Sequence, residues 1–273
     1  MKTLPILIWF VGTTMASAQE PTPDVAVTAM PEFAVAPRGA SVRVAVRLSV
    51  PDGWHIGWVN PGRLGSPTAL SWHAPRSLVG GRPLWPYPIL DTTGATPANV
   101  YRGDVVVLTR FDITADAPLA AVEVRGTLSW ELCRDVCIRQ ARPVTASFRI
   151  DTALTERSAG WAEWEEAGVS FQPVRLRPRF VSAAFDKGSV RITVLLPGGP
   201  PRGSPLMFFP AQAGRPALVV PVHTGRSAWW ARLPLDARDG VGRVAGLLVV
   251  SPTPGQPGNV AFAVDAHVQG RLH

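Results

Sequence analysis

Two cysteines, Cys133 and Cys137, are the only ones among the 273 residues, and three residues separate them. Neighbouring thiols form a disulfide in an oxidising compartment, and such a pair can exchange electrons with another dithiol. A straight strand would hold residues four apart about 13 Å from each other, whereas a disulfide needs Cα atoms within about 7 Å. We therefore predict a turn or a helical turn at residues 134–136, at an exposed edge.

A disulfide that closes so short a loop stabilises a fold only weakly. In the chain-entropy model, closing about five residues stabilises the fold by only about 2 kcal/mol. A bridge that pins two sheets together needs cysteines on distant strands, and this local pair does not fit that pattern. We favour a redox role and keep a local structural bridge and metal ligation as alternatives.

The first 18 residues have the pattern of a cleavable signal peptide. Lys2 supplies the charged start, residues 4–11 are apolar, and Ala16 to Ala18 form a small-residue cleavage site, so the mature chain is expected to begin at Gln19. No later apolar run reaches the 18 residues that a membrane helix requires. We expect an exported, soluble protein.

The composition argues for short strands and against nucleic-acid binding. The chain carries 28 prolines and 25 glycines, which favour many turns, and 46% of its residues are hydrophobic. The net charge is +7, yet no basic run is longer than Arg175, Arg177 and Arg179, which alternate as on the solvent face of a strand. We expect no nucleic-acid partner.

Alternation of apolar and polar residues is the main secondary-structure signal. In residues 41–50, Arg43 and Arg47 fall on one face and five apolar residues on the other: Val42, Val44, Val46, Leu48 and Val50. Further strands are predicted near 25–35, 54–59, 104–113, 119–130 and 143–150, with an irregular segment at 60–102. The pattern predicts an all-β fold, with a β-sandwich over residues 19–150.

The alternation of apolar and polar residues stops at residues 151–170. The pattern there predicts a short helical connector, in which Leu154, Trp161 and Trp164 share a face. Strands then resume, so residues 171–273 are expected to form a second, smaller β-rich domain. Its strands are predicted near 174–184, 189–196, 205–209, 217–222, 227–234, 243–250 and 259–268.

The densest motif lies upstream of the cysteines. Residues 53–62 read Gly-Trp-His-Ile-Gly-Trp-Val-Asn-Pro-Gly, and Ser-Pro-Thr follows at 66–68, Trp-Pro-Tyr-Pro at 85–88 and a tyrosine at position 101. Tryptophans beside such turns commonly anchor loops on a core. Alternatively, some of them line the cysteine site, where an aromatic shell excludes water from a thiol pair.

These motifs, followed by a tryptophan-led strand that ends in Cys-x3-Cys-Ile, resemble the N-terminal periplasmic domain of the DsbD and ScsB thiol:disulfide interchange family. The resemblance covers roughly residues 25–150, and the remainder resembles more weakly a second extracytoplasmic domain of ScsB-like members. It implies an immunoglobulin-like domain, located in the periplasm, whose two cysteines accept electrons from a membrane-embedded partner and pass them to oxidised periplasmic proteins. The resemblance places Cys133 and Cys137 at the positions of the family's redox-active cysteine pair.

The resemblance also implies which residues surround the pair. Residues 91–103 are expected to lie over or beside it as a cover. The expected lining or capping residues are Trp54, His55, Trp58, Tyr101, Trp130, Arg134 and Asp135. Arg134, Arg139 and His55 would lower a thiol pKa, and Asp135 would oppose this. Cys137 is the preferred attacking residue.

The sequence departs from the family pattern in several places. Gly57 replaces an expected aromatic residue, Arg63 stands where an acidic residue is common, and Arg139 takes the place of a proline. Neither a membrane domain nor a thioredoxin-like domain follows before His273, so we expect a membrane-embedded thiol reductase that acts in trans and oxidised periplasmic thioredoxin-like clients.

Two other functions remain open, and no cofactor is expected. Cys133, Cys137, His55 and His73 could ligate copper or zinc. A β-sandwich binding module with a structural disulfide is the other alternative. Hydrolytic chemistry has little support, because Ser66 lacks an evident histidine partner.

Overall fold

A computed structural model of the chain describes residues 23–169, 172–175, 180–186, 189–195, 206–220, 222–224, 229–233, 242–250 and 260–269. The signal peptide expected at residues 1–18 lies outside the described residues. Within the part of the chain that is described, no helix is long and apolar enough to cross a membrane.

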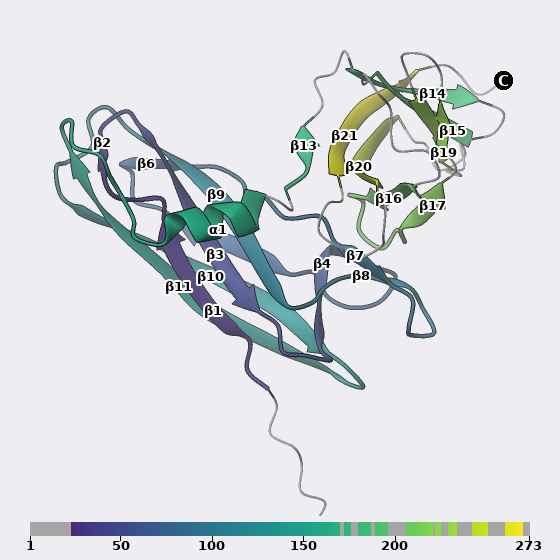
Figure 1. Cartoon of the computed structure of the whole chain (residues 1–273), viewed down its shortest axis with the longest axis horizontal. Helices are drawn as coiled ribbons and strands as arrows, with labels where there is room; N and C mark the ends of the chain where they lie inside the picture. Colours follow the sequence, from purple (N-terminus) through teal and green to yellow (C-terminus); the bar gives the residue numbers. More distant parts are fainter. Residues whose placement is uncertain are drawn as a thin grey trace, which may run out of the picture.

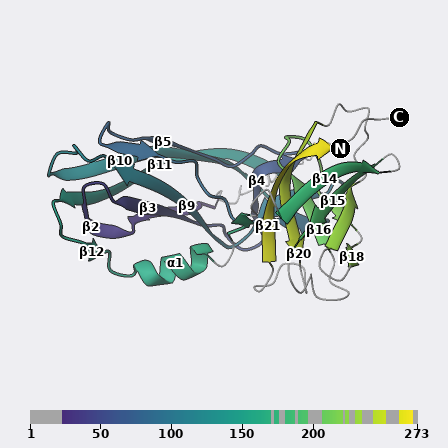
Figure 2. The same ribbon diagram turned by 90° about the horizontal axis from the view of Figure 1, so that it is seen from above.

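The N-terminal half is a sandwich of two β-sheets (Figures 1 and 2). One sheet has the strand order β1 (Ala26–Pro31), β3 (Ser41–Ser49), β9 (Asp104–Ile113) and β6 (Leu78–Gly80). The other runs β12 (Glu156–Arg157), β2 (Phe33–Pro37), β11 (Cys137–Asp151), β10 (Ala121–Cys133), β4 (His55–Gly62), β8 (Ala98–Tyr101) and β7 (Ile89–Asp91). β5 (Ala69–His73) pairs with β10. The predicted all-β sandwich is confirmed.

The apolar face of β3 is buried in the sandwich, as predicted. The opposite face of β3 is covered by a helix. Val42, Val44, Val46, Leu48 and Val50 are buried in the sandwich. On the other side, helix α1 (Trp161–Val169) lies against β3 and β9 (Figure 2). The Arg43 guanidinium lies 5.4 Å from the Trp161 ring centroid, and that of Arg47 lies 4.6 Å from the Trp164 centroid. These cationic side chains therefore bind the helix to the sheet.

Helix α1 begins later than the sequence predicts. Asp151 Oδ1 accepts hydrogen bonds from the backbone N–H groups of Thr152 and Ala153, an Asx turn that competes with helix formation. The chain then pairs with β2 through β12, and Leu154 stays exposed. The helix starts only at Trp161, whose side chain is fully buried.

Residues 60–102 contain short strands where the sequence predicts irregular structure. β5 pairs with β10. β7 and β8 form a hairpin, and β8 pairs with β4. Each of these strands has three to five residues. Runs of that length are too short to show a clear alternation in sequence.

The C-terminal half is a second β-unit, in the upper right of Figure 1. Its strands are β13 (Val174–Arg175), β14 (Val181–Asp186), β15 (Ser189–Val194), β16 (Leu206–Pro210), β17 (Leu218–Val220), β18 (Val222–Thr224), β19 (Trp229–Leu233), β20 (Arg243–Val250) and β21 (Val260–Gln269). They follow the order β17-β16-β20-β21-β14-β15-β19-β18, with β13 on β21.

The two halves share an apolar core. Along β16, Leu206 and Phe208 face the core of the C-terminal unit, whereas Met207 and Phe209 join the cluster that contains Trp58. The Trp58 and Phe209 rings meet edge to face with centroids 6.1 Å apart. β16 is therefore apolar on both faces, as a strand buried on both sides must be.

Asn60 joins the two halves through hydrogen bonds. Its Nδ2 donates to the carbonyl oxygens of Pro210 (2.7 Å) and Gln212 (2.8 Å), and its Oδ1 accepts from the Gly214 N–H (3.1 Å). The side chain is fully buried. Because a buried amide must find partners for both ends, Asn60 fixes the 210–214 segment on β4.

Candidate redox site

Cys133 and Cys137 form a disulfide across the tip of the β10–β11 hairpin. Cys133 ends β10, Cys137 begins β11, and the two residues lie directly opposite each other with a Cα–Cα distance of 4.1 Å. Residues 134–136 form the bend between them. The predicted turn and the predicted disulfide are both confirmed.

The two cysteines differ in exposure. Cys133 is 7% exposed and belongs to the buried residues, whereas Cys137 is exposed. Thiol–disulfide exchange requires the attacking thiolate to reach a sulfur atom along an open path. A large partner can therefore reach this disulfide from the Cys137 side.

His55 lies beside the buried cysteine. It pairs in register with Cys133 across β4 and β10, and its Nδ1 lies 4.0 Å from a carboxylate oxygen of Asp91. Burial lowers the pKa of His55, Arg102 lowers it further, and Asp91 opposes both. The histidine beside the disulfide is therefore neutral at neutral pH.

Asp91 is the charged group behind this histidine. Burial raises its pKa, but hydrogen bonds from Thr93 and from Arg102, at 2.5 Å, outweigh that effect and bring the pKa to about 2. The carboxylate is thus ionised and paired under ordinary conditions. Asp91 and Arg102 both lie within residues 91–103, the segment expected to cover the site.

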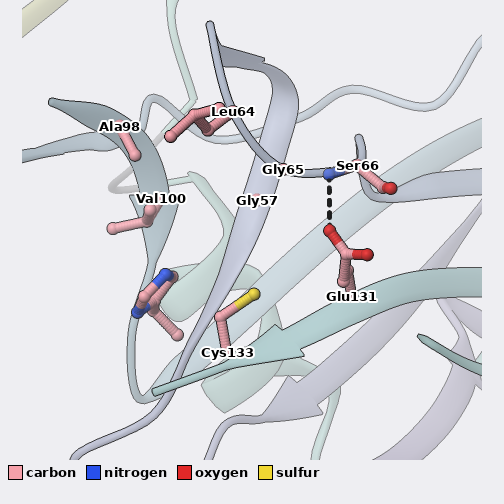
Figure 3. A pocket seen from close by; sticks show the side chains of 9 residues that line it. Gly57, Leu64, Gly65, Ser66, Ala98, Val100, Glu131 and Cys133 are labelled. Carbon is pink, nitrogen blue, oxygen red and sulfur yellow. Dashed lines mark hydrogen bonds between the residues drawn. The ribbon is translucent and has the colours of Figure 1, made fainter. Parts of the chain in front are cut away.

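Glu131 is a site residue that the sequence interpretation missed. One of its carboxylate oxygens and the sulfur atoms of Cys133 and Cys137 all lie within 4.8 Å of one another. Its Oε2 accepts a hydrogen bond from the Ser66 N–H at 2.8 Å, drawn in Figure 3, and its Oε1 lies 3.5 Å from Arg139 Nε. Alternation could have indicated it, because residues 131 and 133 of one strand share a face.

A small hollow opens beside the disulfide. Cys133, Glu131 and His55 line it together with Gly57, Leu64, Gly65, Ser66, Ala98 and Val100 (Figure 3). A Cβ at position 57 would lie 2.5 Å from the Ser66 carbonyl oxygen. Glycine in place of the expected aromatic residue thus lets residues 64–66 approach β4, which brings the Ser66 N–H to Glu131.

The expected aromatic residues lie in the core beneath the site. Trp54, Trp58, Tyr101 and Trp130 are all buried members of one cluster. The Tyr101 hydroxyl donates to the Pro86 carbonyl at 2.7 Å, and burial raises its pKa well above the usual value. None of the four lines the hollow beside Cys133.

The hairpin tip itself is polar and exposed. Arg134 lies over the Trp54 ring, 4.8 Å from its centroid, and pairs with Asp135 at 3.0 Å. Arg134 is thereby fixed between an aromatic face and a carboxylate. Asp135 is 84% exposed and is available to a partner surface.

His73 does not belong to the site. It pairs with Arg125 on β10, eight residues along the strand from Cys133, which corresponds to more than about 25 Å of extended chain. The four-ligand metal set of two cysteines with His55 and His73 is therefore wrong. The acidic ligand that the structure places at the sulfur atoms is Glu131.

Comparison with known proteins agrees with this geometry. Residues 25–148 match the family model described as the N-terminal domain of thiol:disulfide interchange protein DsbD. Over these residues, the chain is similar to the DsbD N-terminal family. No curated protein matches the sequence.

A solved structure supports this fold. The N-terminal periplasmic domain of ScsB from Proteus mirabilis has a TM-score of 0.55 and 16% identity, with 90% of this chain and 93% of that chain covered. This likeness extends the shared fold beyond the DsbD N-terminal segment. The DsbD N-terminal domain of Neisseria meningitidis in the reduced form is 21% identical over 46% of this chain and 87% of its own, with a TM-score of 0.26.

Proposed function

We propose that this chain is a periplasmic thiol:disulfide interchange protein in which Cys133 and Cys137 carry one pair of electrons. It receives them from a membrane-embedded thiol reductase that acts in trans and passes them to oxidised periplasmic thioredoxin-like proteins. The observation that carries this proposal is a disulfide with one exposed member, at a hairpin tip, inside a segment similar to the DsbD N-terminal family.

The exchange conserves electrons and protons. In the reduced pair, the Cys137 thiol loses its proton and attacks the client disulfide, so that a mixed disulfide forms and one client sulfur leaves as a thiolate. Cys133 then attacks the Cys137 sulfur, which reforms the intramolecular disulfide and releases the second client thiolate. Two electrons and two protons pass to the client. Exposure of Cys137 supports its role as the attacking residue.

Residues 91–103 act as the cover in this proposal. Asp91 and Arg102 lie behind His55, and Ala98 and Val100 line the hollow beside Cys133. The 92–97 connection between β7 and β8 includes Gly94 and Pro97 and carries no strand. Movement of this connection would change access to the hollow.

The reduction potential of the pair tests the proposal directly. A value near or above about −230 mV supports a relay, because the pair can then exchange with periplasmic partners. A value below about −300 mV contradicts it and indicates a static bridge. The measurement uses equilibrium with dithiothreitol or glutathione buffers and mass analysis of the alkylated protein.

Single-cysteine variants identify the attacking thiol. Cys133→Ser leaves the exposed Cys137 free and should trap a mixed disulfide with the client in an exporting host. Cys137→Ser leaves the buried Cys133 free and should trap much less. If neither variant captures a protein, and the wild-type pair stays oxidised with every candidate reductase, a β-sandwich binding module with a structural disulfide describes the chain better.

Metal binding by the reduced pair is a second candidate function. It is favoured by the carboxylate of Glu131 beside both sulfur atoms, since two thiolates and a carboxylate can ligate zinc, and thiolates bind copper(I). Titration of the reduced protein with zinc or copper(I), against the Cys133→Ser/Cys137→Ser variant, tests it. Equal affinity of both proteins would exclude a site at the cysteines.

A further inference from the structure

A cavity lies at the junction of the two halves, outside the cysteine site. Its volume is about 370 Å³, which is within the range of small-ligand sites. The N-terminal half contributes Arg82, from the segment after β6. The polar residues that the C-terminal half contributes are Gln212, Arg215, Arg243 and Asp265. The polar lining therefore comes from both halves.

The exposed lining of this cavity is positively charged. Phe208, Pro210 and Val244 complete its wall, but these residues are buried. Arg243 donates two hydrogen bonds to Asp265, at 2.5 and 2.6 Å, which lower the Asp265 pKa and keep the carboxylate ionised. Among the described residues of the lining, three guanidinium groups and one carboxylate give a net charge of +2. The cavity therefore favours an anion.

The backbone that carries Arg82 is held in place. The Gly81 N–H donates to the Arg110 carbonyl at 2.8 Å, and Leu84 forms a β-bridge with Leu108. Both partners belong to β9, so the chain is fixed on either side of Arg82.

The wall of the C-terminal half is fixed as well. Asn60 Nδ2 donates to the carbonyl oxygens of Gln212 and Arg215, at 2.8 and 3.0 Å. Arg243 begins β20, and the β20–β21 ladder also carries Asp265. Since the backbone of neither wall needs to become ordered on binding, little of the binding free energy is lost to chain entropy.

We propose that this cavity binds a phosphate monoester, either a soluble one or the headgroup of a lipid. A guanidinium group presents its N–H donors in a planar fork that matches two oxygens of a phosphoryl group. A phosphate monoester carries nearly two negative charges at neutral pH, which balances the charge of the lining. Within the described part of the chain, Asp265 takes Nε and Nη2 of Arg243, and Nη1 remains for the ligand.

Two probes test the site in the whole protein. Isothermal titration with glycerol 3-phosphate measures binding of a soluble ester, and flotation with phosphatidylcholine vesicles that contain or lack phosphatidic acid measures binding of a lipid. The probe that binds more tightly identifies the source of the ester. Arg82→Gln should weaken this binding about tenfold or more, because a hydrogen bond between charged groups is lost.

Two further variants separate the site from the overall charge of the protein. Arg243→Gln/Asp265→Asn removes one positive and one negative charge, so the net charge stays the same, and we still expect about tenfold weaker binding. Arg76→Gln removes a positive charge at an exposed position that does not line the cavity, and it should bind like wild type. Thermal unfolding checks that each variant is folded.

Three results would overturn the proposal. The first is that wild-type protein binds neither probe. The second is that folded Arg82→Gln binds like wild type, or that Arg76→Gln is weakened equally, which would mean that the net charge of +7 alone attracts the ligand. The third is that succinate binds as tightly as glycerol 3-phosphate, which would assign a carboxylate site instead. The lining contains neither cysteine, so these results do not depend on the interchange function.

Discussion

At the scale of single residues, charged side chains and His55 lie beside the disulfide, and Trp54 lies beneath Arg134 at the hairpin tip. Glu131 lies at the sulfur atoms, and His55 lies between Cys133 and the Asp91–Arg102 ion pair. Tryptophans drew attention in the sequence, yet they pack in the core. Their size and apolar surface make core packing the stronger demand.

The Asp91 pKa predicts a stability change in acid. Its folded-state pKa of about 2 lies below the usual value, so the unfolded chain binds the proton more readily. The stabilisation is complete above about pH 4 and is lost as the pH falls toward 2. His55, whose pKa is also lowered, acts in the same direction from its ordinary value near 6.5 downward.

Asp91→Asn therefore should reduce stability at pH 6 by about 2 kcal/mol and much less at pH 2. Urea unfolding at several pH values measures the difference. Asp52→Asn, in the exposed turn before Trp54, is the control for the substitution itself. A constant gap between wild type and Asp91→Asn from pH 6 to 2 would disprove the assignment.

At the scale of elements, the β10–β11 hairpin brings the site together. Its turn could be predicted from the cysteine spacing and most of its two strands from alternation, but β11 begins at Cys137, six residues before the strand predicted at 143–150. The short strands β5 to β8 could not be predicted, since three to five residues show no clear period. Alternation along β10 places Glu131 on the face of Cys133, but the hydrogen bond that holds its carboxylate depends on how residues 64–66 approach β4, which is a tertiary contact that no local pattern encodes.

Loss of the disulfide should leave the hairpin folded. The β10–β11 ladder pairs Ala121 with Arg149 and continues to Cys133 with Cys137. Cys133→Ala/Cys137→Ala should thus lower the free energy of unfolding by only about 2 kcal/mol. Urea denaturation measures this, with reduced wild-type protein as the control. A variant that is unfolded at 25 °C would show that the bridge is essential to the fold.

At the scale of the whole molecule, the two halves are one packed body. Asn60 and Trp58 of β4 bind the 210–214 segment and Phe209, so the strand that supports the site also supports the contact between the halves. The division into residues 19–150, 151–170 and 171–273 stays a prediction, and packing joins the two halves through residues of the N-terminal motif.

Asn60→Asp should uncouple the halves. A carboxylate cannot donate to the Pro210 and Gln212 carbonyls, and its burial there is costly, so we expect a loss of about 3 kcal/mol or more. Thermal unfolding should change from one transition to two. Gln212→Ala is the control, because only the backbone of Gln212 takes part, and it should behave like wild type. A single unshifted transition in Asn60→Asp would contradict this role.

Cys133 and Cys137 lie directly opposite each other in the β10–β11 ladder. The hairpin ladder already holds their backbones opposite each other. Reduction of the disulfide therefore requires little conformational change beyond rotation of the two side chains. In the proposed interchange, the protein therefore alternates between oxidised and reduced forms with little reorganisation, and a partner that recognises the backbone of this hairpin meets nearly the same surface before and after the transfer.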